Sequence, residues 1–136
     1  MAFGEQIGEE KGSVTAFRVV KEGFGVKVES QFQGQGTMLG VPFVDYATYA
    51  SVYRPDGNFT GTADGVIFTQ EAEAASYTGT GVGHMLGHAG SASWRGALYF
   101  FSASPHFVRL NSVAVLFEFE IDDTARNMEI KYYEWK

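Results

Sequence analysis

The chain has 136 residues and a formal net charge of -6, with 45% hydrophobic residues, 15% aromatic residues and no cysteine. A chain of this length forms one domain around a single core. The acidic charge argues against nucleic-acid binding and against docking to anionic lipid, and the lack of cysteine excludes disulfides and thiolate chemistry.

The composition also bears on where the protein resides. Residues 1–6 show no basic region followed by an apolar run, so we expect no signal peptide. No apolar stretch approaches the roughly 20 residues that a membrane helix needs. Together with the absence of cysteine, these features favour a cytoplasmic protein without a membrane partner.

Along the chain, an alternating pattern follows a polar N-terminal segment. Residues 1–12 are polar and spaced by glycines, which predicts a mobile arm. Beyond them, apolar and polar residues alternate, as is typical of β-strands with one face in a core. The predicted strands cover residues 13–20, 24–33, 37–40, 46–53, 58–69, 74–83, 91–103, 113–121 and 128–135.

Turn sequences separate these strands. Arg54-Pro55-Asp56-Gly57 predicts a tight hairpin turn, because proline presets its φ angle and aspartate and glycine complete the turn. Lys21-Glu22-Gly23, Gly87-His88-Ala89-Gly90 and residues 122–127 predict further turns. Val41-Pro42-Phe43 is expected to be a loop, since proline is poorly placed in a paired central strand.

Glycines also lie inside the strands, most clearly at Gly79, Gly81 and Gly83. Such glycines let strands bend and coil, and a strongly bent antiparallel sheet tends to close on itself. No segment shows helical periodicity over three turns. Residues 13–136 are therefore predicted to form a single all-β domain, an antiparallel closed β-barrel of about eight strands.

The motifs of common catalytic classes are missing. The glycines at 79–83 lack the following helix that a phosphate-binding loop needs, and no Gly-x-Ser-x-Gly nucleophile motif occurs. On a strand, His84 and His88 lie about 13 Å apart, too far to share a metal unless the chain curls back at Gly87. We expect no metal and no cofactor, and catalytic residues cannot be assigned from the sequence.

Charged residues inside apolar strands allow two interpretations. An Arg95–Glu118 pair inside the barrel could orient a ligand carbonyl, because a buried arginine needs a partner. Alternatively, Glu118 and Glu120 point to solvent, with Arg95 as their cross-strand partner. We favour the second interpretation.

Five short elements identify relatives of this chain: Arg54-Pro55-Asp56-Gly57, Thr78-Gly79-Thr80-Gly81-Val82-Gly83, Trp94-Arg95-Gly96-Ala97, Arg109-Leu110-Asn111 and Glu134-Trp135-Lys136. On these elements, the chain resembles small bacterial and archaeal proteins of unassigned function, whose barrel is similar to allene oxide cyclase and to the lipocalin-like calycins. The resemblance implies an allene oxide cyclase-like barrel that binds hydrophobic small molecules, and in some relatives guides their cyclisation. It supplies no catalytic residue.

Three functions stay open. The first is binding of a small hydrophobic ligand inside the barrel, for which the predicted contact residues are Tyr49, Tyr53, Trp94, Arg95, Tyr99, Phe101 and Glu118. The second is a cofactor-independent cyclase or isomerase that holds a flexible apolar substrate in a reactive shape and polarises it with Tyr99 or Arg95. The third is a structural barrel with a filled core that forms homo-oligomers through apolar outer faces.

Overall fold

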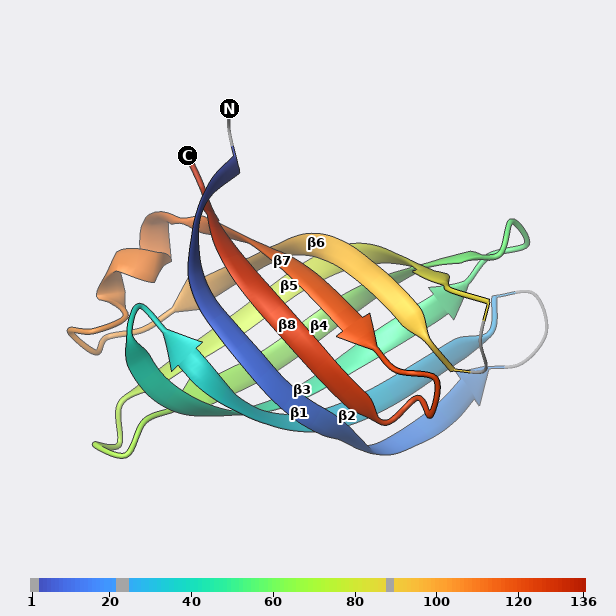
Figure 1. The fold of residues 1–136 in the computed structure, drawn as a ribbon, viewed down its shortest axis with the longest axis horizontal. Helices are drawn as coiled ribbons and strands as arrows, with labels where there is room; N and C mark the ends of the chain where they lie inside the picture. Colours follow the sequence, from blue (N-terminus) through green and yellow to red (C-terminus); the bar gives the residue numbers. More distant parts are fainter. Residues whose placement is uncertain (1–2, 22–24, 88–89) are drawn as a thin grey trace.

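The computed structural model describes residues 3–21, 25–87 and 90–136, which form a closed barrel of eight antiparallel strands (Figure 1). The strands are β1 (Phe3–Lys21), β2 (Lys27–Met38), β3 (Val41–Tyr53), β4 (Asn58–Phe68), β5 (Ala74–Met85), β6 (Ala92–Phe101), β7 (Ala114–Ile121) and β8 (Asn127–Trp135). Each strand pairs with its neighbours in sequence, and β1 also pairs with β8 to close the barrel. The predicted all-β closed barrel is confirmed.

The largest difference from the expected strands lies at the N-terminus. Residues 3–12, expected to be a mobile arm, form the first part of β1. Residues 8–12 pair with β2 on one side and with β8 on the other, so their backbone groups have partners on both edges. Because β8 comes from the opposite end of the chain, local sequence gives no sign of this pairing.

Internal glycines also join two predicted pieces into one strand. Residues 24–33 and 37–40 were expected as separate strands, but β2 runs without a break through Gly34 and Gly36. Both glycines keep partners in β1 and in β3. The glycines therefore bend the strand without ending it.

The hairpin turns follow local backbone chemistry. Arg54–Gly57 forms the predicted turn, in which the Gly57 amide donates to the Arg54 carbonyl at 3.1 Å and Gly57 has a φ of 86°. The loop expected at residues 41–43 is wrong: the turn lies at Leu39 and Gly40, and Pro42 occupies the second position of β3. The turns expected at 21–23 and 87–90 include residues outside the described ones.

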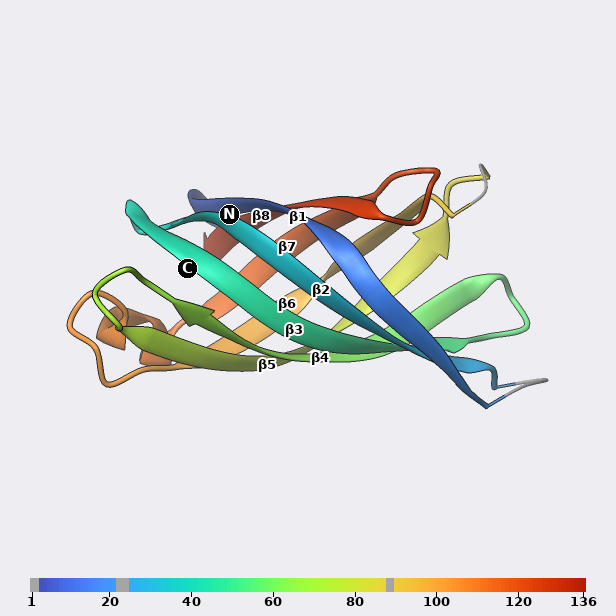
Figure 2. The same ribbon diagram turned by 90° about the horizontal axis from the view of Figure 1, so that it is seen from below.

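The segment between β6 and β7, which carries the short 3-10 helix η1 (Val108–Ser112), lies at one end of the barrel (Figures 1 and 2). Phe107 and Leu110 are fully buried there. Arg109 pairs with Glu134 of β8, and the Asn111 side-chain amide donates to the Ser102 carbonyl at 2.9 Å. Among the described residues, no helix is long and apolar enough to cross a membrane.

Inward-facing glycines leave room for large rings in the core. Gly83 lies opposite Phe59 on β4 and Trp94 on β6. A Cβ atom at position 83 would lie 2.6 Å from the Phe59 ring and 2.7 Å from the Trp94 ring. These two rings pack on each other with their centroids 4.9 Å apart. The glycine is therefore a condition for this aromatic packing.

Replacing Gly83 with alanine should destabilise the barrel by about 1–3 kcal/mol, because the added methyl group overpacks the Phe59–Trp94 contact. Urea unfolding of the wild type and the variant measures this change. Thr78→Ala is the matched control, since Thr78 lies on the exposed outer face of the same strand. Equal free energies of unfolding for the two variants would contradict the assigned role of Gly83.

Candidate functional site

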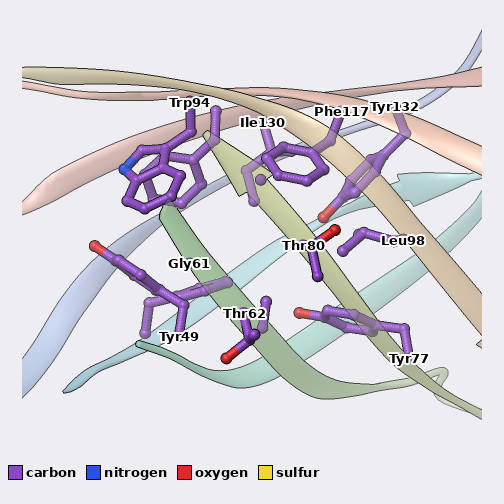
Figure 3. A pocket seen from close by; sticks show the side chains of 14 residues that line it. Tyr49, Gly61, Thr62, Tyr77, Thr80, Trp94, Leu98, Phe117, Ile130 and Tyr132 are labelled. Carbon is purple, nitrogen blue, oxygen red and sulfur yellow. The ribbon is translucent and has the colours of Figure 1, made fainter. Parts of the chain in front are cut away.

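A small cavity of about 50 Å³ lies inside the barrel (Figure 3). Its walls are mainly apolar and come from β2 to β8. The lining residues are Phe32, Tyr49, Gly61, Thr62, Ala63, Tyr77, Thr80, Gly81, Trp94, Leu98, Phe117, Phe119, Ile130 and Tyr132. This composition is typical of sites for small apolar molecules.

Three aromatic rings fix one wall of the cavity. The Tyr49 ring centroid lies 6.0 Å from that of Trp94 and 5.6 Å from that of Phe119, and both pairs are edge-to-face. Such contacts hold each ring in one orientation. Gly61 and Gly81 form part of the lining and are partners across β4 and β5. Because glycines have no side chain, they leave space that larger residues would fill.

A buried polar cluster borders the same cavity. Tyr77 donates its hydroxyl hydrogen to the Asp45 carboxylate, at 3.0 Å to Oδ1 and 3.1 Å to Oδ2. Tyr132 Oη and Glu10 Oε1 form a second hydrogen bond at 2.6 Å. All four side chains are buried, and the two tyrosines also line the cavity. The carboxyl–tyrosine cluster, defined as these four residues, therefore gives an apolar cavity one polar end.

Burial and mutual repulsion perturb both carboxyl groups. Burial raises the pKa of Glu10 far above its usual range, and the negative charge of Asp45 raises it further. Burial also raises the pKa of Asp45, although hydrogen bonds from Glu10 and Tyr77 offset part of that increase. The negative charge is more stable on Asp45 than on Glu10, because both oxygens of Asp45 accept from the Tyr77 hydroxyl. We assign the shared proton to Glu10 at neutral pH.

One oxygen of Glu10 accepts no hydrogen bond. Glu10 Oε2 is buried, and no described residue donates to it. It rests against Gly34, where an added Cβ atom would collide with it. An unpaired buried carboxylate oxygen is costly, and a neutral carboxyl group lowers that cost. The position of Oε2 is thus a second, independent reason to describe Glu10 as neutral.

The structure divides the seven predicted ligand-contact residues into those that line the cavity and those that do not. Tyr49 and Trp94 line the cavity. Tyr53 lies at the end of β3, where its ring packs on that of Phe59 with the centroids 5.0 Å apart, but it is not part of the cavity lining. The other four lie on the outer face of the barrel, where Tyr99 is 53% exposed and Phe101 is 68% exposed. This outer group consists of Arg95, Tyr99, Phe101 and Glu118.

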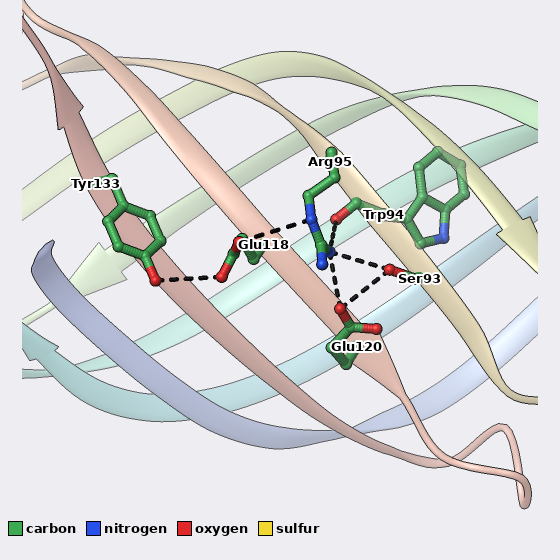
Figure 4. Close-up of polar contacts among 6 residues, drawn as sticks. All are labelled: Ser93, Trp94, Arg95, Glu118, Glu120 and Tyr133. Carbon is green, nitrogen blue, oxygen red and sulfur yellow. Dashed lines mark hydrogen bonds and ion pairs between the residues drawn. The ribbon is translucent and has the colours of Figure 1, made fainter. Parts of the chain in front are cut away.

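Arg95 belongs to an ion-pair network on the outer surface (Figure 4). Its Nη1 lies 2.8 Å from Glu120 Oε1, and its Nε lies 3.7 Å from Glu118 Oε2. Tyr133 donates to Glu118 at 3.1 Å. The favoured interpretation of these charges, a cross-strand pairing in solvent, is therefore the one that the structure shows.

The histidines lie apart from the cavity. His106 Nδ1 is 2.6 Å from Glu73 Oε1 on the surface, and His84 is exposed at the end of β5. His88 lies outside the described residues. Within the described ranges, no group of three or more side chains is arranged to hold a metal ion.

Sequence reasoning did not single out any member of the carboxyl–tyrosine cluster. Glu10 fell within the expected arm, and Asp45 stood just before a predicted strand. A signal for Asp45 did exist, because it is a lone acidic residue between Val44 and Tyr46 in an apolar stretch. Such a position allows a buried carboxyl group with a specific partner.

The chain shares its fold with solved structures. No protein-family model matches it, and no curated protein matches it. A protein of unknown function from Clostridium acetobutylicum ATCC 824 is similar with a TM-score of 0.85 and 14% identity, covering 100% of both chains. A conserved protein of unknown function from Rhodopseudomonas palustris has a TM-score of 0.81 and 12% identity, covering 96% of this chain and 95% of that one.

A third similar structure is a beta-barrel like protein from Acinetobacter baumannii AYE. It has a TM-score of 0.79 and 10% identity, and the match covers 97% of this chain and 94% of that one. At these identities, the likenesses establish the fold alone. They support the barrel and leave its ligand and activity to be argued from the site.

Glu10→Gln should flatten the pH dependence of stability. The pKa of Glu10 is raised by folding, so the folded chain binds more protons than the unfolded chain above roughly pH 4.3. The free energy of unfolding therefore falls as pH rises. Glutamine keeps an oxygen that accepts from Tyr132 but cannot ionise. We therefore expect the free energy of unfolding of Glu10→Gln to fall by about 1–3 kcal/mol less than that of the wild type between pH 5 and pH 8.

Urea unfolding at several pH values measures this difference. Glu129→Gln on β8 is the control, because Glu129 is exposed. Parallel stability curves for the wild type and Glu10→Gln would show that Glu10 is ionised in the folded protein.

Arg95→Ala should change stability by less than about 1 kcal/mol, because its ion pairs are exposed and screened by solvent. It should also leave the affinity of any molecule bound in the cavity unchanged, since Arg95 lies on the outer face. Thermal unfolding and a binding titration of the same variant test both statements. A clear loss of affinity would assign ligand contact to the outer face instead.

Proposed function

We propose that the barrel binds a small, mainly apolar molecule in its interior cavity. The observation that carries the proposal is the cavity itself, which is lined by aromatic rings in edge-to-face contact and by glycines that leave space between the strands. Protein cores are close-packed, and an apolar void costs stability. A cavity kept in the middle of such a core supports a role in binding.

The volume limits what can bind. An apolar cavity of about 150 Å³ binds benzene, so a cavity of about 50 Å³ favours a ligand of about three to five non-hydrogen atoms. A larger molecule requires the rings of Tyr49 and Trp94 to move. The apolar walls select for shape, and the tyrosine hydroxyls at the polar end orient the ligand.

Cyclase or isomerase activity is a second candidate. The observation that supports it is the carboxyl–tyrosine cluster, since carboxyl groups with raised pKa values occur at sites of acid–base chemistry. The resemblance to allene oxide cyclase-like barrels agrees with this candidate. Formation of homo-oligomers through outer residues such as Tyr99 and Phe101 stays a prediction.

Filling the cavity should abolish binding. Ala63 lines the cavity, and Ala63→Val adds two methyl groups to that space. In a Trp135→Phe background, Trp94 supplies the only indole signal, because the chain has two tryptophans. We expect xenon and 2-methylpropene, which has four carbon atoms, to shift the Trp94 indole resonance and raise the melting temperature of the parent, and to do neither in Ala63→Val.

Ala50→Val is the matched control, because Ala50 lies on the outer side of the neighbouring strand β3 and pairs with Thr62. This variant should bind both probes as the parent does. Native mass spectrometry of the wild-type protein, followed by denaturing extraction, identifies any molecule that copurifies. No probe response in the parent and no copurified molecule would favour the structural barrel over the binding protein.

A further inference from the structure

The four side chains of the carboxyl–tyrosine cluster form one hydrogen-bonded chain. Tyr132 donates to Glu10 Oε1 at 2.6 Å, and Tyr77 donates to both oxygens of Asp45. A further hydrogen bond joins the side chains of Glu10 and Asp45. No described residue donates to Glu10 Oε2, so neutral Glu10 carries its hydrogen on Oε2 and donates it to Asp45. Each hydroxyl and carboxyl hydrogen of the cluster is therefore used within the cluster.

The polar end of the cavity consequently offers only acceptors. Tyr77 and Tyr132 line the cavity and are 5% and 1% exposed. Figure 3 shows their hydroxyl groups directed into the space between the walls. Both hydroxyl groups donate to carboxyl groups, and within the described ranges neither phenolic oxygen receives a hydrogen bond. A ligand that meets these oxygens must therefore supply an N–H or O–H group.

The cluster also carries a negative charge inside the barrel. With the proton on Glu10, the charge resides on Asp45, which is fully buried. The ion pairs of the described residues include neither Asp45 nor Glu10. A buried charge is costly unless a charge of opposite sign pairs with it. A cation at the polar end of the cavity would supply that pairing.

The walls of the cavity suit an organic cation. Half of the residues that line the cavity are aromatic. The ring of Tyr49 is in edge-to-face contact with those of Trp94 and Phe119. Faces of aromatic rings attract ammonium groups, and that of tryptophan attracts them most strongly. Alkyl groups on the nitrogen would contact the same apolar walls, which gives an alkylated ammonium an advantage over a metal ion.

We propose that the cavity takes a small alkylammonium ion, whose N–H group donates to a tyrosine oxygen and whose charge is balanced by the carboxylate of Asp45. This inference rests on the proposed function and adds the ligand class. The cavity favours about three to five non-hydrogen atoms, a range that includes trimethylammonium. Like the lysine side chain, such an amine is a cation at neutral pH.

The experiment compares trimethylammonium with 2-methylpropane, which have the same branched shape but differ in charge and in the N–H donor. Each is titrated at neutral pH into the Trp135→Phe protein, with the Trp94 indole resonance as the NMR readout. Asp45→Asn keeps an oxygen that accepts from Tyr77 but removes the charge, and burial still keeps Glu10 neutral. It should weaken trimethylammonium by about tenfold or more and leave 2-methylpropane unchanged.

Glu10→Gln is the matched control. Glutamine accepts from Tyr132, donates to Asp45 and leaves the charge of Asp45 in place, so this variant should retain trimethylammonium. Xenon, which needs only space, shows whether each variant keeps its cavity. A further comparison needs no variant of the cluster: acetate, an anion of similar size, should not bind the parent, because its charge would be repelled by that of Asp45.

The outcomes separate the two proposals. If xenon, 2-methylpropane and trimethylammonium all leave the parent unchanged, the binding function is wrong and the ammonium site falls with it. If a neutral probe binds but trimethylammonium does not, or if acetate binds as well as trimethylammonium, the cavity stands and the ammonium site is overturned.

The variants complete the test. Equal affinity of the parent and Asp45→Asn for trimethylammonium also overturns the ammonium site. Loss of trimethylammonium in Asp45→Asn, with xenon binding intact and with retention in Glu10→Gln, supports it. If Asp45→Asn loses xenon as well, the comparison of trimethylammonium with acetate in the parent decides.

Discussion

The hydrogen-bonded seam between β1 and β8 is the constraint on which the rest of the structure depends. It joins residues from the two ends of the chain, such as Phe3 and Trp135, and turns an open sheet into a barrel. Closure removes both sheet edges and fixes the inside of every strand. It also brings Glu10 of β1 beside Tyr132 of β8, which creates one half of the carboxyl–tyrosine cluster.

The interior of the closed barrel has an aromatic region and a polar region. Toward one side, the rings of Tyr49, Trp94 and Phe119 contact one another edge to face. Toward the other, Asp45 and Glu10 are buried with a tyrosine each. The cavity lies where these two environments meet. A ligand there would contact apolar walls and a polar end together, as is common in small-molecule sites.

The barrel could be predicted from the sequence because it rests on local patterns, but the polar cluster could not. Alternation and internal glycines indicate bent strands, and β7 has the expected apolar inner face with Glu118 outside. Asp45 reverses this rule: it is buried, while its neighbours Val44 and Tyr46 are 40% and 47% exposed. Hydropathy alone assigns these three residues to the wrong faces.

Uncertainty over which strand face points inward also explains why several predicted ligand contacts lie outside the cavity. Aromatic residues occur on both faces of β6, where Leu98 and Phe100 are buried while Tyr99 and Phe101 are exposed. Aromatic content therefore does not tell which face points inward. Trp94 lines the cavity, whereas its neighbour Arg95 lies on the outer surface, as the alternation of the strand requires. The pairing between strands, which cannot be seen in the sequence, determines whether each side chain points into the barrel or to solvent.

The connectivity of the barrel has a consequence for how the chain folds. Every strand pair other than β1–β8 joins consecutive strands, so these contacts can form by adding one hairpin at a time. The seam instead closes nearly the whole chain, and Glu10 and Tyr132 are separated by 122 positions. Its loop-closure entropy is the largest in the fold. Because Glu10 is solvated and ionised at neutral pH in the unfolded chain and its pKa is raised by burial in the barrel, closing the barrel is coupled to the uptake of a proton.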